Sequence, residues 1–300
     1  MVVATGFFDG VHIGHRAVVS ALCRIAHERG EKSMIVTFWP HPRTVLRQDA
    51  AELRLLTSLD EKKRMLYALG VDEIEVIDFT KDFSTLSAEA FIRDYLIGRF
   101  GATALVLGYD HRLGGGSPMT REELESLVQS LGLDTYRLGE EDFDGKAVSS
   151  TAIRKLLASG DVERANGMLG YSYSLCGVVV AGNRLGREIG FPTANIELYE
   201  PLKLLPADGA YAVEADVEGR TYYGMTNIGR RPTVSSISKR TIETNIFDFS
   251  SDIYGLDVCL RFIGRIRGEM KFSSIDMLRS RLAEDKGAAE RIISEKRLTR

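Results

Sequence analysis

Short apolar runs alternate with segments of helical period from the first residue to about residue 160. The apolar runs span residues 2–5, 34–38, 74–77 and 104–107. Between them, apolar residues recur every three or four positions, and glycines such as Gly30 and Gly70 end two of these stretches. Ser87 precedes a third helical stretch and is predicted to cap it. Strands that alternate with helices are typical of βαβ units, so we predict an α/β domain with a parallel sheet over residues 1–165.

Beyond Gly170 the pattern changes to strands without intervening helices. Apolar and β-branched runs cover residues 175–180, 211–217, 222–225, 241–249 and 256–263, separated by Gly-rich or Asp/Ser turns. This arrangement is typical of a small antiparallel barrel. Helical period returns at residues 275–282 and 288–298. We therefore predict a second domain over residues 166–300, an antiparallel β-barrel with a C-terminal helix.

Composition and charge restrict the class of protein. The 300 residues are 44% hydrophobic and 27% charged, as in a globular protein. The net charge of -3 gives no overall attraction for nucleic acid or anionic membranes. The N-terminus lacks a signal-peptide pattern, and no apolar run reaches the roughly 18 residues of a membrane span. We therefore expect a cytoplasmic protein that binds neither nucleic acid nor membranes.

Three cysteines, Cys23, Cys176 and Cys259, lie far apart in the sequence. Their number is odd and no CxxC spacing occurs, so the sequence indicates neither a disulfide framework nor a zinc site. We predict that all three are small buried hydrophobic residues.

The segment Gly6-Phe-Phe-Asp-Gly-Val-His-Ile-Gly-His15 follows the first predicted strand and opens the first predicted helix. His12 and His15 are three residues apart and therefore share one face of the first helical turn, while Gly14 lets a ligand approach the backbone. A helix N-terminus offers free N–H groups that suit a polyphosphate. Two solvated histidines beside a glycine turn are the alternative, but the strand-turn-helix context favours a ligand site.

This segment resembles the signature of the nucleotidyltransferase half of bacterial bifunctional riboflavin kinase/FAD synthetases. The resemblance implies a Rossmann-like nucleotidyltransferase domain in which a phosphate oxygen of FMN attacks the α-phosphorus of ATP. In that chemistry His12 and His15 hold the ATP phosphates and stabilise charge as pyrophosphate leaves. The other ATP-binding residues implied are Gly6, Phe8, Asp9, Gly10 and Gly14.

Three further segments of the first half bear on this resemblance. Thr37-Phe-Trp-Pro-His-Pro42 resembles the family segment that lines the flavin, which implies flavin contacts by Pro40, His41 and Pro42; in isolation it would be a proline-stiffened loop. Val148-Ser-Ser-Thr-Ala-Ile-Arg154 resembles the second nucleotide-binding signature, although its serines would also cap a helix. It implies phosphate contacts by Ser149, Ser150, Thr151 and Arg154, with Arg154 catalytic. The third segment, Gly108-Tyr-Asp-His-Arg-Leu-Gly114, keeps the flavin-side Asp110 but has His and Leu where the family has aromatic residues.

The second half contains Gly182-Asn-Arg-Leu-Gly-Arg-Glu-Ile-Gly190 followed by Phe191-Pro-Thr-Ala-Asn195. The glycine run matches neither the P-loop nor the dinucleotide fingerprint and by itself would predict a flexible hairpin. Threonine and asparagine supply hard oxygen ligands that suit Mg²⁺. The combined run resembles the riboflavin kinase signature. It implies Mg²⁺-ATP binding by Gly182, Gly186, Arg187, Thr193 and Asn195, with Thr193 and Asn195 on the metal.

Phosphorylation of a neutral hydroxyl benefits from a general base. All five histidines precede residue 112, which favours a carboxylate in the second half. The family uses a glutamate on a later strand, which corresponds to Glu243; a glutamate on an alternating strand is otherwise a solvated residue. Asn245 stands where many members have histidine.

The resemblance covers essentially the whole chain and implies an enzyme that makes FMN from riboflavin and ATP, then FAD from FMN and ATP, with Mg²⁺. One alternative is a riboflavin kinase whose first domain is degenerate or acts on another phosphorylated substrate, as the His111 departure suggests. Another is a regulator that binds flavin or nucleotide without turnover. Family members carry a short segment before the position of Gly6, so we expect an edge strand that this chain does not supply.

Overall fold

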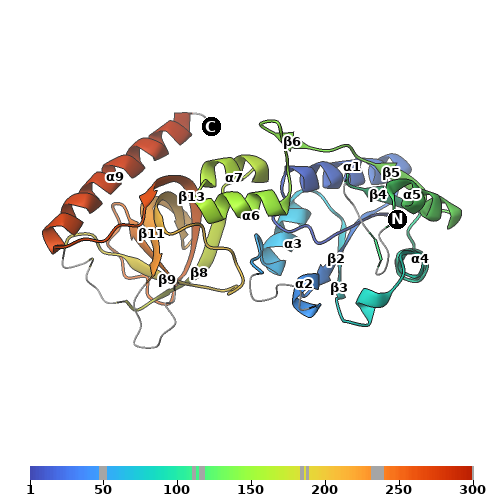
Figure 1. Cartoon of the computed structure of the whole chain (residues 1–300), viewed down its shortest axis with the longest axis horizontal. Helices are drawn as coiled ribbons and strands as arrows, with labels where there is room; N and C mark the ends of the chain where they lie inside the picture. The colour runs from blue at the N-terminus through green and yellow to red at the C-terminus, as the bar shows by residue number, and fades with distance from the viewer. Residues whose placement is uncertain are drawn as a thin grey trace. The chain divides into compact units, whose positions relative to one another are not determined.

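The computed structural model describes residues 1–46, 53–109, 113–114, 119–182, 186, 189–230 and 240–298. The chain forms two compact units, Met1–Ser150 and Thr151–Arg300. In Figure 1 the first runs from blue to green and the second from green to red. None of the helices in the described ranges is long and apolar enough to cross a membrane. The domain boundary expected between residues 165 and 166 stays a prediction.

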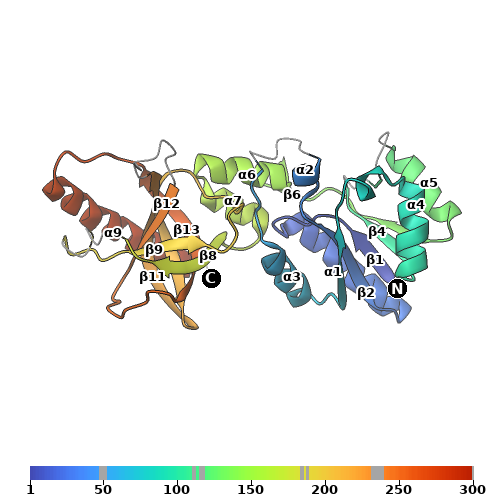
Figure 2. The same ribbon diagram turned by 90° about the horizontal axis from the view of Figure 1, so that it is seen from below.

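The first unit is built on a sheet of five parallel strands in the order β3-β2-β1-β4-β5, which confirms the predicted α/β class. Figure 2 labels the three central strands β2, β1 and β4. The strands are β1 (Val2–Thr5), β2 (Ser33–Trp39), β3 (Glu73–Asp78), β4 (Ala104–Leu107) and β5 (Asp134–Arg137). The helical segments are α1 (Ile13–Arg29), α2 (Pro42–Val45), α3 (Leu59–Ala68), η1 (Phe83–Thr85), α4 (Ala88–Ala90), η2 (Phe91–Arg99) and α5 (Arg121–Ser130). A short hairpin pairs β6 (Asp142–Phe143) with β7 (Lys146–Ala147).

Alternate residues of the central strand β1 enter two different cores. Val2 and Ala4 pack with Leu22 of α1, whereas Val3 packs with Ile92 of η2 and Leu124 of α5. A strand that is buried on both faces reads as a continuous apolar run, which is why β1 was predictable. Strand β5 was not predicted, because its sequence Asp-Thr-Tyr-Arg is half polar and its residues are alternately exposed.

Predicted helix ends agree with the structure at two positions. Gly30 ends α1 in the left-handed conformation, with φ of 65°. Ser87 caps α4 by accepting a hydrogen bond from the Ala90 N–H. Strand β1 ends at Thr5 and α1 begins at Ile13, so residues 6–12 form the turn that connects them.

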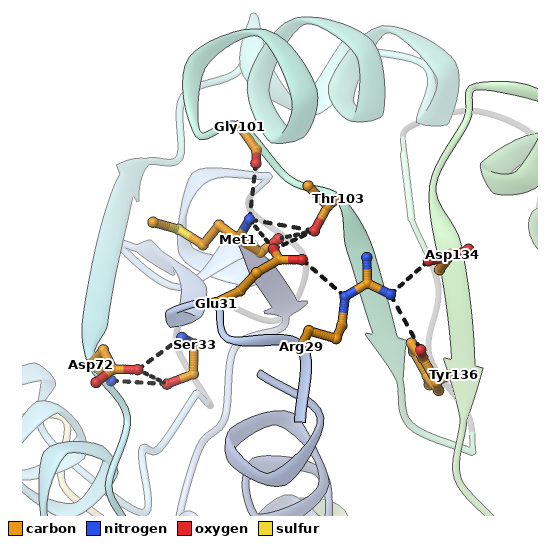
Figure 3. Close-up of polar contacts among 9 residues, drawn as sticks. All are labelled: Met1, Arg29, Glu31, Ser33, Asp72, Gly101, Thr103, Asp134 and Tyr136. Carbon is orange, nitrogen blue, oxygen red and sulfur yellow. Dashed lines mark hydrogen bonds and ion pairs between the residues drawn. The ribbon is translucent and has the colours of Figure 1, made fainter. Parts of the chain in front are cut away.

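The amino ends of the strands are tied together by side chains (Figure 3). Arg29 donates to Glu31 at 2.9 Å and to Asp134 at 2.6 Å. Asp72 accepts from the Ser33 N–H at 2.8 Å and from the Ser33 hydroxyl at 2.7 Å. These bonds, the backbone one first, lower the pKa of Asp72. These hydrogen bonds lie at the amino edge of the sheet. The predicted ligand site lies at the opposite, carboxyl edge.

The second unit contains a closed six-stranded barrel in the order β10-β11-β12-β9-β8-β13, which confirms the predicted antiparallel barrel. Its strands are β8 (Ser174–Val180), β9 (Ala194–Leu198), β10 (Gly209–Val217), β11 (Arg220–Arg230), β12 (Arg240–Ile246) and β13 (Asp257–Gly268). Its helices are α6 (Ser150–Ser159), which begins at the last residue of the first unit, α7 (Val162–Leu169) and α9 (Ile275–Leu298). Strand β9 was not predicted, since it overlaps the Thr193-Ala-Asn195 motif.

Residues 283–287 were expected to separate two helices, but α9 continues through them. Asp285, in the middle of this polar run, is only 1% exposed and pairs with Arg267 of β13 and Arg281 of α9. The run is therefore an anchored helical turn and not a linker.

The prediction for the cysteines is wrong. Cys176 of β8 and Cys259 of β13 stand opposite one another in the antiparallel pairing, with 4.1 Å between their Cα atoms, and form a disulfide. Cys23 is free and only partly buried. Because 83 residues separate the bonded pair, only the strand register brings them together.

Candidate active sites

The turn after β1 is held in an unusual backbone conformation. Phe8 and Val11 have φ of 52° and 35°, a region that residues with a Cβ rarely adopt. The Val11 N–H donates to the Phe8 carbonyl at 3.2 Å, and the Gly10 N–H donates to the Thr57 hydroxyl at 3.1 Å. Strain of this kind costs of order 1–3 kcal/mol per residue and persists where surrounding structure holds it, frequently at functional sites.

His12 and His15 lie together at the start of α1, as their spacing predicted. Nδ1 of His12 accepts from the His15 N–H at 3.3 Å, so His12 caps the helix. The two imidazole rings are stacked with centroids 3.6 Å apart. Burial lowers the pKa of His15 well below its usual value, and the charges of His12 and Lys62 lower it further. Nδ1 of His15 is buried without a hydrogen-bond partner, so a neutral imidazole nitrogen remains available to a ligand.

Asp9 links the same turn to residues 56 and 57 through hydrogen bonds. Its buried carboxylate accepts from the Leu56 and Thr57 N–H groups, each at 3.0 Å. The Ser150 hydroxyl donates to the Asp9 carbonyl at 2.9 Å, which brings the segment of residues 148–154 to the turn after β1. These contacts give Asp9 a structural role in shaping the turn.

An aromatic cavity of 480 Å³ opens beside this turn. Gly6, Phe8 and His15 line one part of it, and Pro42 lines another. Its other lining residues include four phenylalanines in mutual ring contact, Phe38, Phe79, Phe83 and Phe91. These phenylalanines were not predicted as site residues, because phenylalanine on an apolar face most simply indicates a hydrophobic core.

The remaining predicted residues of the first half are placed as follows. The His41 ring lies 4.1 Å from that of Phe7, and Pro40 follows Trp39 through a cis peptide bond. Ser149 is partly buried, Thr151 is exposed, and Arg154 lies on α6 in the second unit. Gly14 carries no side chain against the His12 ring, where a Cβ would lie 3.4 Å away. Asp110 falls outside the described residues.

In the second unit, strand register brings Glu243 to the kinase-like motif. Glu243 of β12 stands opposite Asn195 of β9 on one side and Asn227 of β11 on the other. Directly opposed residues in an antiparallel pair have Cβ atoms about 4.5–5.5 Å apart. The Thr241 hydroxyl donates to Glu243 Oε1 at 3.5 Å. The carboxylate therefore lies beside the predicted metal-binding amide, although 48 positions separate Glu243 from Asn195 in the sequence.

The glycine run packs against residues 191–195. A Cβ on Gly182 would lie 2.1 Å from Nδ2 of Asn195, and one on Gly186 would lie 2.3 Å from the Phe191 carbonyl oxygen. The Phe191 N–H donates to the Gly186 carbonyl at 2.8 Å. Close packing thus explains both glycines, and it brings the glycine run and residues 191–195 together. Arg187 lies outside the described residues.

Two cavities of the second unit share Thr193. The larger, of 430 Å³, is lined by Thr193, Thr244 and residues 249–254. The smaller, of 180 Å³, is lined by Thr193, Glu243 and Asn245, and by apolar residues such as Leu278 and Leu282 of α9. Strand β12 alternates between them, since successive side chains point to opposite faces. Thr193 is therefore the residue through which a group bound in one cavity is linked to a group bound in the other.

The donor chemistry here fits Mg²⁺ carried by a nucleotide. Within the ranges the structure describes, no three His, Cys, Asp or Glu side chains converge on a metal-sized site. Thr193 and Asn195 offer neutral oxygens, and Glu243 adds a carboxylate beside them. Mg²⁺ keeps several waters and takes phosphate oxygens, so it needs few protein ligands.

Two family models match the chain. A model described as FAD synthetase covers residues 1–152, and one described as riboflavin kinase covers residues 169–293. The first contains His12 and His15, and the second contains Thr193, Asn195 and Glu243.

Curated relatives match over nearly the full length. The chain is 38% identical to the bifunctional riboflavin kinase/FMN adenylyltransferase of Bacillus subtilis, over 99% of this chain and 93% of the relative. It is 36% identical to the protein of the same name from Escherichia coli K12, over 95% and 90% of the two chains. A crystal structure described as a macrolide-efflux protein from Streptococcus pneumoniae is 31% identical, with a TM-score of 0.89 over 96% of this chain and 93% of that one.

Proposed function

Because the chain belongs to the family of bifunctional riboflavin kinase/FMN adenylyltransferases, its two activities are riboflavin phosphorylation and FMN adenylylation, and we propose which residues perform each. The observation that carries the assignment is the register that places Glu243 beside Asn195, at the cavity it shares with Thr193. The stacked His12 and His15 carry the assignment in the first unit.

In the kinase unit, riboflavin occupies the smaller cavity, where α9 supplies apolar contacts, and ATP occupies the larger one. Glu243 accepts the proton of the riboflavin 5′-hydroxyl as its oxygen bonds to the γ-phosphorus. The bond from the γ-phosphorus to the β,γ-bridging oxygen breaks, and ADP leaves. Thr193 and Asn195 hold Mg²⁺-ATP at the point where the cavities meet; bound Mg²⁺ neutralises charge on the phosphates.

In the adenylylation unit, the flavin ring of FMN lies against the cluster of Phe38, Phe79, Phe83 and Phe91. Its phosphate is already an anionic nucleophile, so no general base is required. A phosphate oxygen of FMN bonds to the α-phosphorus of ATP while pyrophosphate departs. His12 and His15 orient the phosphates and offer hydrogen bonds to the developing charge.

Several expectations extend this assignment. Mg²⁺ with ATP is proposed at both sites, riboflavin, FMN and FAD are the proposed flavin ligands, and Arg154 with Ser149, Ser150 and Thr151 is proposed to contact phosphate. The cytoplasmic location and the absence of nucleic-acid and membrane partners stay predictions from the sequence.

The test is product analysis after incubation with riboflavin, excess ATP and Mg²⁺. The wild-type chain should form FMN first and FAD later. Glu243→Gln should abolish FMN formation yet convert supplied FMN to FAD, while the double variant His12→Ala/His15→Ala should do the converse.

Either assignment fails if its variant keeps the turnover it should lose. Accumulation of FMN alone by the wild-type chain would favour the kinase with a degenerate first domain. Bound flavin without any product would favour the regulator.

A further inference from the structure

Lys62 is a buried cation beside the adenylylation site. It lies on α3, is 1% exposed, and donates from Nζ to the Phe7 carbonyl and to the Thr37 hydroxyl, each at 2.9 Å. Its Nζ also stands 4.1 Å from the centroid of the Phe7 ring. Both hydrogen-bond acceptors are therefore neutral oxygens.

No carboxylate of the described residues lies within ion-pair distance of Lys62. Two other buried charges have ion-pair partners: Glu214 with Arg261 at 2.8 Å, and Asp285 with Arg267 at 2.7 Å. The buried Asp9 carboxylate is instead satisfied by backbone N–H groups. Burial of an unpaired ammonium costs several kcal/mol, and an apolar residue of similar volume would stabilise the fold better. Burial also lowers the pKa of Lys62 to about 8, against the opposing attraction of Asp9. Because the buried Lys62 ammonium lowers the stability of the fold and lies beside a cavity, we infer that it has a functional role.

The peptide between Phe7 and Phe8 connects Lys62 to the cavity. In a trans peptide the carbonyl and the N–H point in opposite directions, so the ammonium that holds the Phe7 carbonyl also orients the Phe8 N–H away from α3. The Phe8 N–H has no hydrogen-bond acceptor anywhere in the part of the chain that the structure describes. Phe8 is nevertheless 4% exposed and lines the 480 Å³ cavity with Gly6 and His15. A buried backbone donor of this kind needs a partner.

We propose that Lys62 is a positioning residue for adenylyl transfer, which fixes the Phe7–Phe8 peptide so that the Phe8 N–H donates to a nucleotide phosphate beside His15. The cation also polarises the peptide, which makes its N–H a stronger donor. Lys62 itself does not touch the substrate. The inference rests on the adenylylation proposed for this unit.

The test compares Lys62→Met with Arg64→Met, a change at an exposed position of the same helix. Lys62→Met should lower kcat for FMN adenylylation at least 10-fold, with less than a twofold change in KM for FMN, because phosphate donors act mainly in the transition state. Arg64→Met should leave both constants within twofold of wild type. Riboflavin phosphorylation by the same chains is the internal control and should not change.

A second readout follows the Phe8 amide directly. In protein labelled with ¹⁵N-phenylalanine, a non-hydrolysable ATP analogue should shift the Phe8 amide resonance of wild type, and Lys62→Met should reduce that shift by more than half. Thr37→Val removes one oxygen partner of Nζ, and it also removes the hydrogen bond from the Thr37 hydroxyl to the same Phe7 carbonyl at 3.3 Å. Because Lys62 still holds that carbonyl, the variant should lower kcat by a smaller factor, and it covers the case in which Lys62→Met does not fold.

Unchanged kcat together with an unchanged Phe8 shift in Lys62→Met would overturn the proposal for Lys62. Unchanged kcat in Thr37→Val would overturn it if Lys62→Met does not fold. If the wild-type chain itself formed no FAD, the adenylylation assignment would fail instead, so the two failures are distinguishable.

Discussion

At the residue scale, the two sites depend on charges that are buried for different reasons. Asp9 is satisfied by backbone N–H groups and shapes the turn after β1. Asp285 is satisfied by two arginines and anchors a helix. The Lys62 ammonium donates to two neutral oxygens and lies over the Phe7 ring, and we propose that its charge acts on the Phe7–Phe8 peptide beside the cavity. Asp9 and Asp285 therefore stabilise structure, and Lys62 is retained at a cost to stability.

The cost of burying the charged Lys62 should make the free energy of unfolding depend on pH. The folded-state pKa of Lys62 is about 8, below the ordinary 10.5, so the folded chain loses this proton first as pH rises. Below pH 8 the lysine is charged in both states and the full burial penalty applies. Between pH 8 and 10.5 the unfolded chain binds more protons, so stability should rise, by up to about 3 kcal/mol from this group.

The measurement is urea unfolding of wild type and Lys62→Met at pH 7 and pH 10. Trp39, the single tryptophan, lies on β2 and reports the first unit by its fluorescence. Lys62→Met should be the more stable protein at pH 7, and its advantage should shrink at pH 10. An advantage that does not depend on pH would argue against a charged buried Lys62.

At the element scale, one strand and one helix organise the kinase site. Strand β12 presents Glu243 and Asn245 to the smaller cavity and Thr244 to the larger. Helix α9 covers the smaller cavity with Leu278 and Leu282. Its position depends on Asp285, whose carboxylate accepts from Nε of Arg267 at 2.9 and 3.0 Å. The anchor should therefore matter for flavin binding as well as for stability.

Asp285→Ala should destabilise the second unit by about 3–5 kcal/mol, because it leaves Arg267 buried without its counterion. It should raise KM for riboflavin and leave adenylylation of supplied FMN unchanged. The measurements are unfolding followed by circular dichroism and the two separate activity assays. The matched control is Glu284→Ala, since Glu284 is 66% exposed and its pair with Arg281 contributes about 1 kcal/mol or less. Equal effects of the two variants would contradict the anchoring role.

At the scale of the whole molecule, each compact unit contains its own cavities. The aromatic cavity is lined by residues of the first unit alone, and the two cavities that share Thr193 are lined by residues of the second. On the proposed assignment FMN is made in the second unit and used in the first, and we predict that it is released between the two reactions.

A mixture of Glu243→Gln and His12→Ala/His15→Ala chains should make FAD from riboflavin and ATP, although neither variant does so alone. FMN should appear first, and the delay before FAD should shorten as the Glu243→Gln concentration rises, because released FMN must reach a second chain. Chromatography of timed samples checks this. If the mixture makes no FAD while Glu243→Gln still converts added FMN, the intermediate is not released.

Local patterns were enough to predict much of the fold. Four of the five parallel strands and five of the six barrel strands lie where apolar runs stand in the sequence. The two exceptions were missed for different reasons: β5 is short and half polar, whereas β9 alternates apolar and polar residues but overlaps the Thr193-Ala-Asn195 motif. The stacked pair of His12 and His15 was likewise predictable, because a three-residue spacing at a helix start is a local property.

The two fold classes, most of the strands and the motifs could be predicted from local patterns, since hydrophobic period, capping and glycine spacing act over a few residues. Tertiary structure alone decided which distant residues meet. Strand register placed Glu243 beside Asn195 and Cys176 opposite Cys259. Packing of α3 brought Lys62 under Phe7, and packing of α9 buried Asp285. Contacts of this kind depend on the summed geometry of many elements, and no local pattern of residues encodes them.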